Sequence, residues 1–138
     1  MSRTRRLKER FLPKALVCGM LEDMGRVLFL KRKDKQGAEQ LEMPCLLLYA
    51  GDPVSQLTEA FREQTGIDGE VGGIVLETRH NAGSRRRKSF VPCMVFRIRA
   101  KSMKARPASQ FSGYRWLSLE DAKKEKLGRN ARWVMAIR

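Results

Sequence analysis

A chain of 138 residues, of which 42% are hydrophobic, suits a single folded domain and is too apolar for a disordered protein. No apolar stretch approaches the roughly 18 residues of a membrane-spanning helix, and the N-terminus lacks a signal-peptide pattern, so we expect an intracellular, cytoplasmic protein. The net charge of +14, from 29 lysines and arginines against 15 acids, predicts attraction to polyanions such as nucleic acid, unless the bases only form a solvated surface.

The first 13 residues are basic and end at a proline, so we expect an N-terminal arm over 1–13 and one domain over 14–138. Two mainly apolar runs follow, at 15–22 and 26–31. They are separated by Asp23-Met24-Gly25, a turn signal that supplies a glycine for positive φ. This pattern predicts a β-hairpin. A third strand is expected over 41–48, where Pro44 cannot donate to a ladder and implies an edge or a bend.

A helix is predicted over residues 54–65. Asp52 is placed to cap its start, Pro53 suits the first helical position, and Gly66 suits the position just after its end. The helical period of 3.6 residues places three apolar side chains on one face. They are Val54, Leu57 and Phe61.

The rest of the chain predicts more strands than helices. Strands are expected over 71–78, 90–98 and 114–117. Ser118 is expected to cap a helix, and a last helix is expected to start near Asn130. Because several strands are joined by turns and not by crossover helices, the order of elements predicts a mixed sheet.

Three cysteines lie in apolar, strand-like segments, and the chain has a single histidine. A structural zinc site therefore lacks ligands, and the odd number argues against a framework of disulfides. We expect buried free thiols at the three positions, because unpaired cysteine is among the most buried residue types. They are Cys18, Cys45 and Cys93.

Four segments, in the correct order, resemble the Nudix family. They are the hairpin over 15–32, Pro44 followed by Gly51-Asp52, the segment 57–67, and the segment 114–122. The resemblance covers nearly all of the chain after the arm and implies an α/β (α+β) fold, a Nudix-type α/β/α sandwich with a mixed sheet. It also implies cleavage of nucleoside diphosphate derivatives with Mg²⁺ or Mn²⁺, held by glutamates of the helix that carries the family's motif.

The segment 57–67 departs from that motif, whose end runs R-E-U-x-E-E-x-G-U with U apolar. When Gly66 is aligned, the family's Arg-Glu pair falls on Glu59-Ala60. The family's Glu-Glu pair falls on Glu63-Gln64, so one of three expected carboxylates remains. Cys45-Leu46 also replaces a double glycine, of which one carbonyl is a metal ligand in the family. We therefore expect weak metal affinity.

The remaining acids are the candidate catalytic and metal-binding residues. Glu63 is the chief candidate for both roles, Glu59 lies one helical turn earlier, and Asp52 at the helix entrance is a candidate third ligand. The alternative is that Glu59 and Glu63 are exposed partners of neighbouring bases. Glu77 is a further candidate ligand, since some family members use an acid outside the motif. Mg²⁺ or Mn²⁺ is the expected cofactor if the protein is active, and none otherwise.

Basic residues form the candidate phosphate or nucleic-acid site, in a loop and in the N-terminal arm. They are Arg85, Arg86, Arg87 and Lys88 in the loop, and Arg3, Arg5 and Arg6 in the arm. His80 is a candidate base, although a lone histidine is more often structural. Trp116 and Trp133 are expected to be core residues more than platforms for bases.

The leading hypothesis is a degenerate Nudix-fold protein that binds RNA or a nucleotide through a basic surface, with weak or absent pyrophosphohydrolase activity. An active Mg²⁺- or Mn²⁺-dependent Nudix hydrolase is the alternative. A third possibility is a scaffold that docks on a ribonucleoprotein or an acidic protein. No membrane partner is expected.

Overall fold

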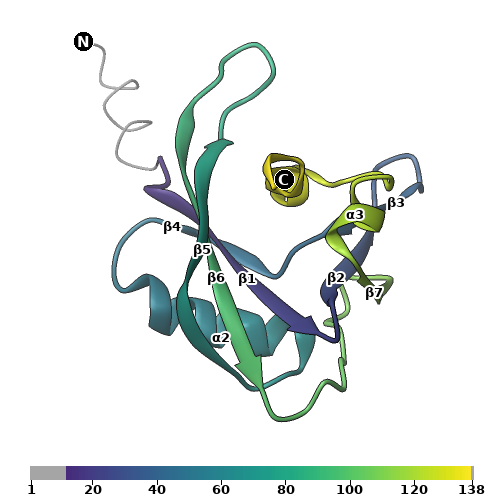
Figure 1. The fold of residues 1–138 in the computed structure, drawn as a ribbon. Coiled ribbons are helices and arrows are strands. Elements are labelled where there is room, and N and C mark those ends of the chain that lie inside the picture. The colour runs from purple at the N-terminus through teal and green to yellow at the C-terminus, as the bar shows by residue number, and fades with distance from the viewer. Residues whose placement is uncertain (1–11, 138) are drawn as a thin grey trace.

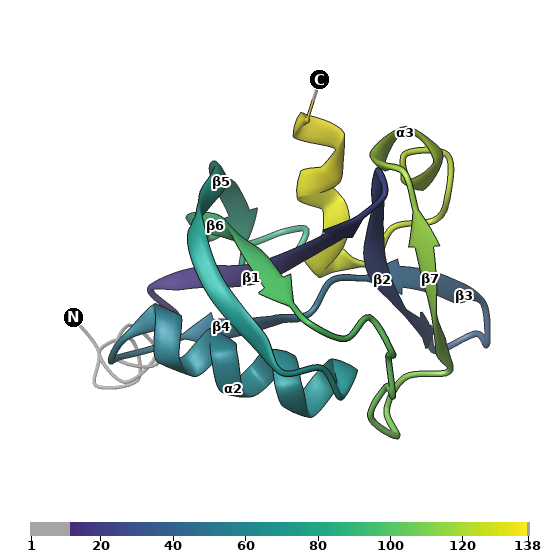
Figure 2. The same ribbon diagram turned by 60° about the horizontal axis from the view of Figure 1, so that its bottom comes forward.

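The computed structural model describes residues 12–137 (Figures 1 and 2). Seven strands, two α-helices and one 3₁₀ helix follow one another in this part of the chain. They are β1 (Ala15–Asp23), β2 (Arg26–Lys33), β3 (Glu39–Glu42), β4 (Cys45–Leu48), α2 (Pro53–Thr65), β5 (Gly69–Asn81), β6 (Phe90–Ala100), β7 (Gly113–Leu117), α3 (Leu119–Ala122) and the 3₁₀ helix η1 (Arg129–Ala136). None of the described helices is long and apolar enough to cross a membrane.

The sheet is built around β1. This strand pairs antiparallel with β4 on one side and parallel with β6 on the other, and β5 completes that edge by pairing antiparallel with β6. At its far end β1 turns into β2, which pairs antiparallel with β3 and with β7. One parallel pair among antiparallel pairs makes the sheet mixed, as the sequence predicted.

Helices cover both faces of the sheet. Leu57 and Phe61 of α2 pack with Val17 and Leu21 of β1 in one core cluster. The neighbouring β1 side chains, Leu16, Cys18 and Met20, point to the other face and pack with Trp133 and Val134 of η1. Because both faces are covered, every β1 residue from 15 to 21 is buried. Figure 2 shows β1 between α2 and η1, which confirms the α/β/α sandwich.

The ends of α2 lie where local sequence signals placed them. The carboxylate of Asp52 accepts hydrogen bonds from the backbone N–H groups of Val54 and Ser55, at 3.3 and 3.1 Å. After the last turn Gly66 adopts a φ of 73° and donates its N–H to the Arg62 carbonyl. Of the three apolar residues expected on one face, Leu57 and Phe61 are buried, whereas Val54 in the first turn is 39% exposed.

The predicted strand over 41–48 is two strands with different partners. β3 pairs with β2, whereas β4 pairs with β1. The chain changes partner at Pro44, which has no N–H to give to a ladder. Its carbonyl still accepts the N–H of Gly19, at 2.9 Å. At Pro44 the chain therefore not only bends but also changes its partner strand, from β2 to β1.

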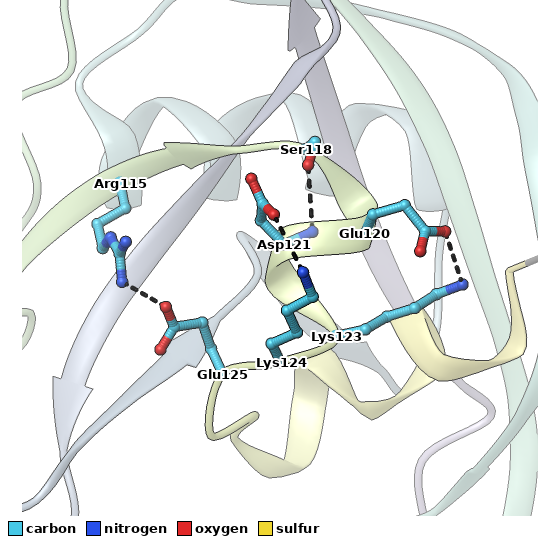
Figure 3. A network of polar contacts seen from close by, with 7 residues as sticks. All are labelled: Arg115, Ser118, Glu120, Asp121, Lys123, Lys124 and Glu125. Carbon is cyan, nitrogen blue, oxygen red and sulfur yellow. Dashed lines mark hydrogen bonds and ion pairs between the residues drawn. The ribbon is translucent and has the colours of Figure 1, made fainter.

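The last third of the chain contains less α-helix than expected. α3 has only four residues, with the Ser118 hydroxyl accepting the N–H of Asp121 at 3.1 Å, and the final helix is a 3₁₀ helix. Figure 3 shows the ion pairs around this turn, among them Arg115 with Glu125 at 2.9 Å. Such exposed pairs contribute little stability individually, so this turn depends mainly on the apolar contacts of Ala122 with the core.

Candidate functional site

A large cavity lies between β5 with its following loop and η1. Its volume is approximately 660 Å³. Leu16 and Cys93 lie at its base, and Trp133 of η1 lines one side. In Figure 1 the hairpin of β5 and β6 extends beyond the rest of the sheet, and η1, seen end-on, lies beside it. Two segments that are about 50 residues apart thus form one concave surface.

Positive charge dominates this cavity. Arg79 and Arg85 line it from the hairpin, and Arg129 and Arg132 line it from η1. No aspartate or glutamate is among its lining residues. Within residues 12–137 none of these arginines forms an ion pair with a carboxylate. Four guanidinium groups with no acid among them create a strongly positive local potential.

Two of the four arginines have structural contacts. Arg129 donates to the backbone carbonyls of Asn81, at 2.7 Å, and Gly83, and so ties the loop to η1. The guanidinium of Arg79 lies 5.1 Å from the centre of the Phe90 ring. Arg85 and Arg132 have no such partner among the described residues and are exposed. They are the groups best placed to meet an anion.

The loop after β5 is held in one shape by its own hydrogen bonds. The side-chain carbonyl of Asn81 accepts the N–H groups of Gly83 and Ser89, both at 3.0 Å. The Ser84 hydroxyl accepts the N–H of Arg87 at 2.9 Å. Gly83 leaves no space for a side chain, since a Cβ there would lie 2.1 Å from the Arg87 carbonyl oxygen. Of the loop's predicted phosphate ligands, Arg85 lines the cavity, whereas Arg86, Arg87 and Lys88 are exposed elsewhere on the loop.

His80 lies in the wall of this cavity. It is 9% exposed, and burial lowers its pKa, with a further lowering by the charge of Arg129. The imidazole is therefore mainly neutral at physiological pH, so one ring nitrogen can donate a hydrogen bond and the other can accept one. Trp133 lies in the same wall, and its buried indole N–H has no partner among the described residues.

The acids expected to hold a metal are not gathered in one place. Glu59 and Glu63 are both exposed and lie one turn apart on α2. Asp52 is occupied by the helix cap, roughly 16 Å along the axis from Glu63. Glu77 is exposed on β5. Residues 12–137 contain no group of three His, Cys, Asp or Glu side chains placed to hold a metal ion.

Gln64 makes two hydrogen bonds to the backbone of Cys45. Its amide N–H donates to the Cys45 carbonyl at 2.7 Å, and its side-chain oxygen accepts the Cys45 N–H at 3.2 Å. A carbonyl that binds a cation must face a positive ion, but the Cys45 carbonyl faces an N–H donor that already takes one of its lone pairs. The residues at this point therefore do not fit the divalent metal that the family resemblance implies.

A small pocket of approximately 100 Å³ lies beside this hydrogen-bonded pair. Glu42 lines it together with Gln64, Arg32 and Asn130. Burial raises the pKa of Glu42, and the charge of Arg32 with the backbone N–H of Asn130 partly offsets this effect. Gly128 borders the carboxylate so closely that a Cβ there would lie 2.1 Å from it.

Sequence reasoning missed several of these residues. In the sequence, Glu42 is an ordinary strand residue and Arg79 is an ordinary base at the end of a strand, and neither carries a signal of a site. Arg129 and Arg132 offered a weak signal, because their spacing of three residues places them on one side of a helix. The expected arm residues Arg3, Arg5 and Arg6 lie outside the described part of the chain.

No protein-family model and no curated protein matches the sequence. Solved structures do match. The chain is similar to the ORF135 protein of E. coli, with 18% identity over 88% of this chain and 86% of that one and a TM-score of 0.71. A MutT Nudix hydrolase from Burkholderia pseudomallei has 20% identity over 90% and 96%, with a TM-score of 0.69. The Nudix domain of Shewanella oneidensis NrtR, solved with ADP-ribose, has 14% identity over 99% and 96%, with a TM-score of 0.64. The chain therefore has the Nudix fold.

Proposed function

We propose that this Nudix-fold protein binds the phosphate groups of a nucleotide or of RNA in its basic cavity and has weak or absent pyrophosphohydrolase activity. The observation that carries the proposal is the set of four arginines without a carboxylate around one cavity. Guanidinium groups bind phosphate oxygens through charge-assisted hydrogen bonds. Arg85 and Arg132, on opposite walls, are the expected phosphate ligands.

An aromatic side chain near the cavity supports a nucleotide over a simple anion. Phe90 is 53% exposed, and Arg79, which lies over its ring, lines the cavity. Exposed aromatic rings beside basic residues stack on the bases of single-stranded nucleic acid. The similar Nudix domain from Shewanella oneidensis was solved with ADP-ribose, which also combines a base with phosphates.

The weak hydrolysis in this proposal rests on what occupies the positions of the family's metal ligands. Ala60 and Gln64 bring no negative charge, and the amide of Gln64 is bonded to the Cys45 carbonyl. Asp52 is bonded to the backbone at the start of α2. Glu63 and Glu59, one turn apart, remain as an exposed pair of acids. Two exposed carboxylates bind Mg²⁺ or Mn²⁺ only weakly.

Binding is tested by titrating tryptophan fluorescence, because Trp133 lines the cavity. ADP-ribose, ADP and a short single-stranded RNA are titrated at low and at physiological salt. R85A/R132A is expected to weaken binding by tenfold or more, on the order of 1.4 kcal/mol for each factor of ten. K33A/K35A removes two exposed charges from the β2–β3 hairpin and is the matched control. Equal affinity of the two double variants, or RNA binding that ignores salt, would contradict the proposal.

Hydrolysis is tested on the same nucleotides with Mg²⁺ and with Mn²⁺. We expect the wild-type chain to hydrolyse these nucleotides no faster than E63Q does, because Glu63 and Glu59 alone hold the metal poorly. Turnover by the wild-type chain that E63Q abolishes would establish the alternative, an active Nudix hydrolase. Association with a protein partner that survives nuclease treatment, without nucleotide binding, would favour a scaffold.

A further inference from the structure

Three thiols that are distant in the sequence meet in the core. Cys18 lies on β1, Cys45 on β4 and Cys93 on β6, and β1 is the strand between the other two. Strand pairing places Cys18 directly opposite Cys45, and Cys93 belongs to the same core cluster as Cys18. All three are free, with Cys18 and Cys93 buried and Cys45 half-buried. The predicted burial is therefore found at Cys18 and Cys93 but not at Cys45, and the convergence of the three thiols is a new feature.

Cys18 and Cys45 are direct cross-strand partners. The next pair along the ladder, Gly19 with Pro44, shares a backbone hydrogen bond of 2.9 Å. Hydrogen-bonded and non-hydrogen-bonded pairs alternate in antiparallel strands, so Cys18 and Cys45 form a non-hydrogen-bonded pair. Such pairs have Cα atoms about 4.5 Å apart, which lies within the range that a disulfide spans.

Both side chains lie on the same face of the sheet. Cys18 belongs to the core cluster beneath η1, and Cys45 packs against that cluster. Cys93 is in the same cluster but is opposite Leu16, two residues away from the partner of Cys18 on the parallel strand. The register therefore favours Cys45 over Cys93 as the partner of Cys18 in a covalent bond.

We propose that Cys18 and Cys45 form a reversible disulfide when the protein meets a small-molecule disulfide such as oxidised glutathione. The Cys45 thiolate attacks one sulfur of the reagent, forms a mixed disulfide and releases one small thiol. The Cys18 thiolate then attacks the Cys45 sulfur, forms the protein disulfide and releases the second small thiol. Two protein thiols are oxidised, one reagent disulfide is reduced, and the two protons pass to the two released thiolates.

The surroundings of the thiols give this order of events. Cys45 lines the small pocket beside Gln64 and is the most accessible of the three. Cys18 is fully buried, and burial raises its pKa, so it reacts only with a sulfur delivered beside it. Cys93 borders the basic cavity, and the neighbouring Cys18 thiol lowers its pKa, but it lies opposite Leu16 and not opposite Cys18, so we expect it to stay reduced.

Oxidation would reach the basic cavity through η1. The Cys18 thiol donates to the backbone carbonyl of Asn130, at 3.9 Å, in the first turn of η1. A disulfide removes this S–H donor. Arg129 and Arg132, the two arginines of η1, lie within two residues of Asn130, so the redox state acts on the wall that carries them.

The test uses the full-length reduced chain, treated with oxidised glutathione without denaturant. Remaining thiols are alkylated, and tryptic peptides are identified by mass. We expect one disulfide that joins the peptides of Cys18 and Cys45, and one alkylated Cys93. Circular dichroism before and after treatment checks that the chain stays folded.

Variants separate the proposed pair from chance oxidation. C93S is expected to form the disulfide as the wild-type chain does, whereas C45S is expected to keep both remaining thiols free. C18A is expected to stop at a glutathione adduct on Cys45, because it lacks the second thiol that would displace the glutathione. The substitution removes only one sulfur from the buried position. Three alkylated cysteines in the wild-type chain would overturn the proposal. So would a stable glutathione adduct there, or a bond between Cys18 and Cys93.

Discussion

The side-chain amide of Gln64 and the peptide group of Cys45 satisfy one another, through hydrogen bonds of 2.7 and 3.2 Å. The contact joins the last turn of α2 to the start of β4, 19 residues away. A glutamate at position 64, as in the Nudix motif, has no N–H to give to the Cys45 carbonyl. The N–H group of the Gln64 amide thus faces this carbonyl where, in the family, a cation does.

The first prediction concerns the substitution Q64E. It places a carboxylate oxygen against the Cys45 carbonyl and adds negative charge to the C-terminal turn of α2. Both effects are unfavourable, and we expect a loss of about 1–3 kcal/mol in the free energy of unfolding at neutral pH. Urea denaturation measures the loss. Millimolar Mn²⁺ is expected to restore part of it, because a cation can then lie between the two oxygens.

Q56E is the matched control for this prediction. The Gln56 amide also donates to a backbone carbonyl, that of Ala50 at 2.6 Å, but it lies near the N-terminus of the same helix and at the surface. A carboxylate there interacts favourably with the helix dipole. We expect a smaller loss of stability and no response to Mn²⁺. Equal losses in the two variants would show that the Gln64 contact has no special role.

The second prediction is that A60E/Q64E gains a metal site. With Glu63 the double variant has the three helix carboxylates that the family motif carries, and a hard divalent cation needs several oxygen ligands. Calorimetry is expected to detect Mn²⁺ binding by the variant and much weaker binding by the wild-type chain. A60Q, which adds a side chain of the same size without charge, is the control. Tight binding of one Mn²⁺ ion by the wild-type chain would refute the view that the site is degenerate.

Local signals in the sequence predicted α2 well. Asp52, Pro53 and Gly66 act on backbone groups within a few residues of themselves, so their roles can be inferred without knowledge of the fold. The continuous burial of β1 from residue 15 to residue 21 also follows from its mainly apolar sequence, once helices are expected on both faces. The Nudix resemblance rests on the same kind of short segments, and similar solved structures support it.

The candidate site could not be predicted in this way because its contacts join distant segments. The contact of Gln64 with Cys45 depends on the position of β4, which the sequence placed in one strand with β3. The cavity depends on the packing of η1 against β5, which brings Arg129 within hydrogen-bonding distance of the Asn81 carbonyl, 48 residues away. Neither contact leaves a periodic pattern or a motif in the chain.

The third prediction concerns pH and Glu42. Burial raises its pKa in the folded state above the ordinary value of 4.5, so the protonated form is favoured by folding. Its contribution to stability is present below about pH 4.5 and is lost as the pH rises through the folded-state pKa. E42Q should therefore be more stable than the wild-type chain at neutral pH, with a difference that shrinks toward pH 4. Urea denaturation at several pH values measures it.

E70Q provides the comparison for Glu42. Glu70 is exposed on β5, and neutral substitutions of exposed residues usually change stability by less than about 0.5 kcal/mol. The difference between E70Q and the wild-type chain is expected to stay small across the same pH range. If E42Q were less stable than the wild-type chain at neutral pH, the charged form of Glu42 would instead be stabilised by the pocket.

The fourth prediction concerns His80, the only histidine of the chain. Burial and then the charge of Arg129 lower its pKa below the ordinary value of 6.5, so folding favours the neutral imidazole. The resulting stability is present above about pH 6.5 and is lost as the pH falls through the folded-state pKa. H80Q should remove this loss. The imidazole signals in a proton NMR titration report the pKa directly, without interference from another histidine.

Variants of the two η1 arginines test the cause of this shift. R129Q removes the charge that acts on His80 and should raise the histidine pKa part of the way toward 6.5. R132Q removes an equal charge from the same cavity and should move it less, because Arg132 does not contribute to the lowered pKa. Inorganic phosphate, if it binds among the arginines, should raise the pKa further, since a nearby anion favours the imidazolium. A histidine pKa at or above 6.5 in the wild-type chain, or equal shifts in the two variants, would contradict this account.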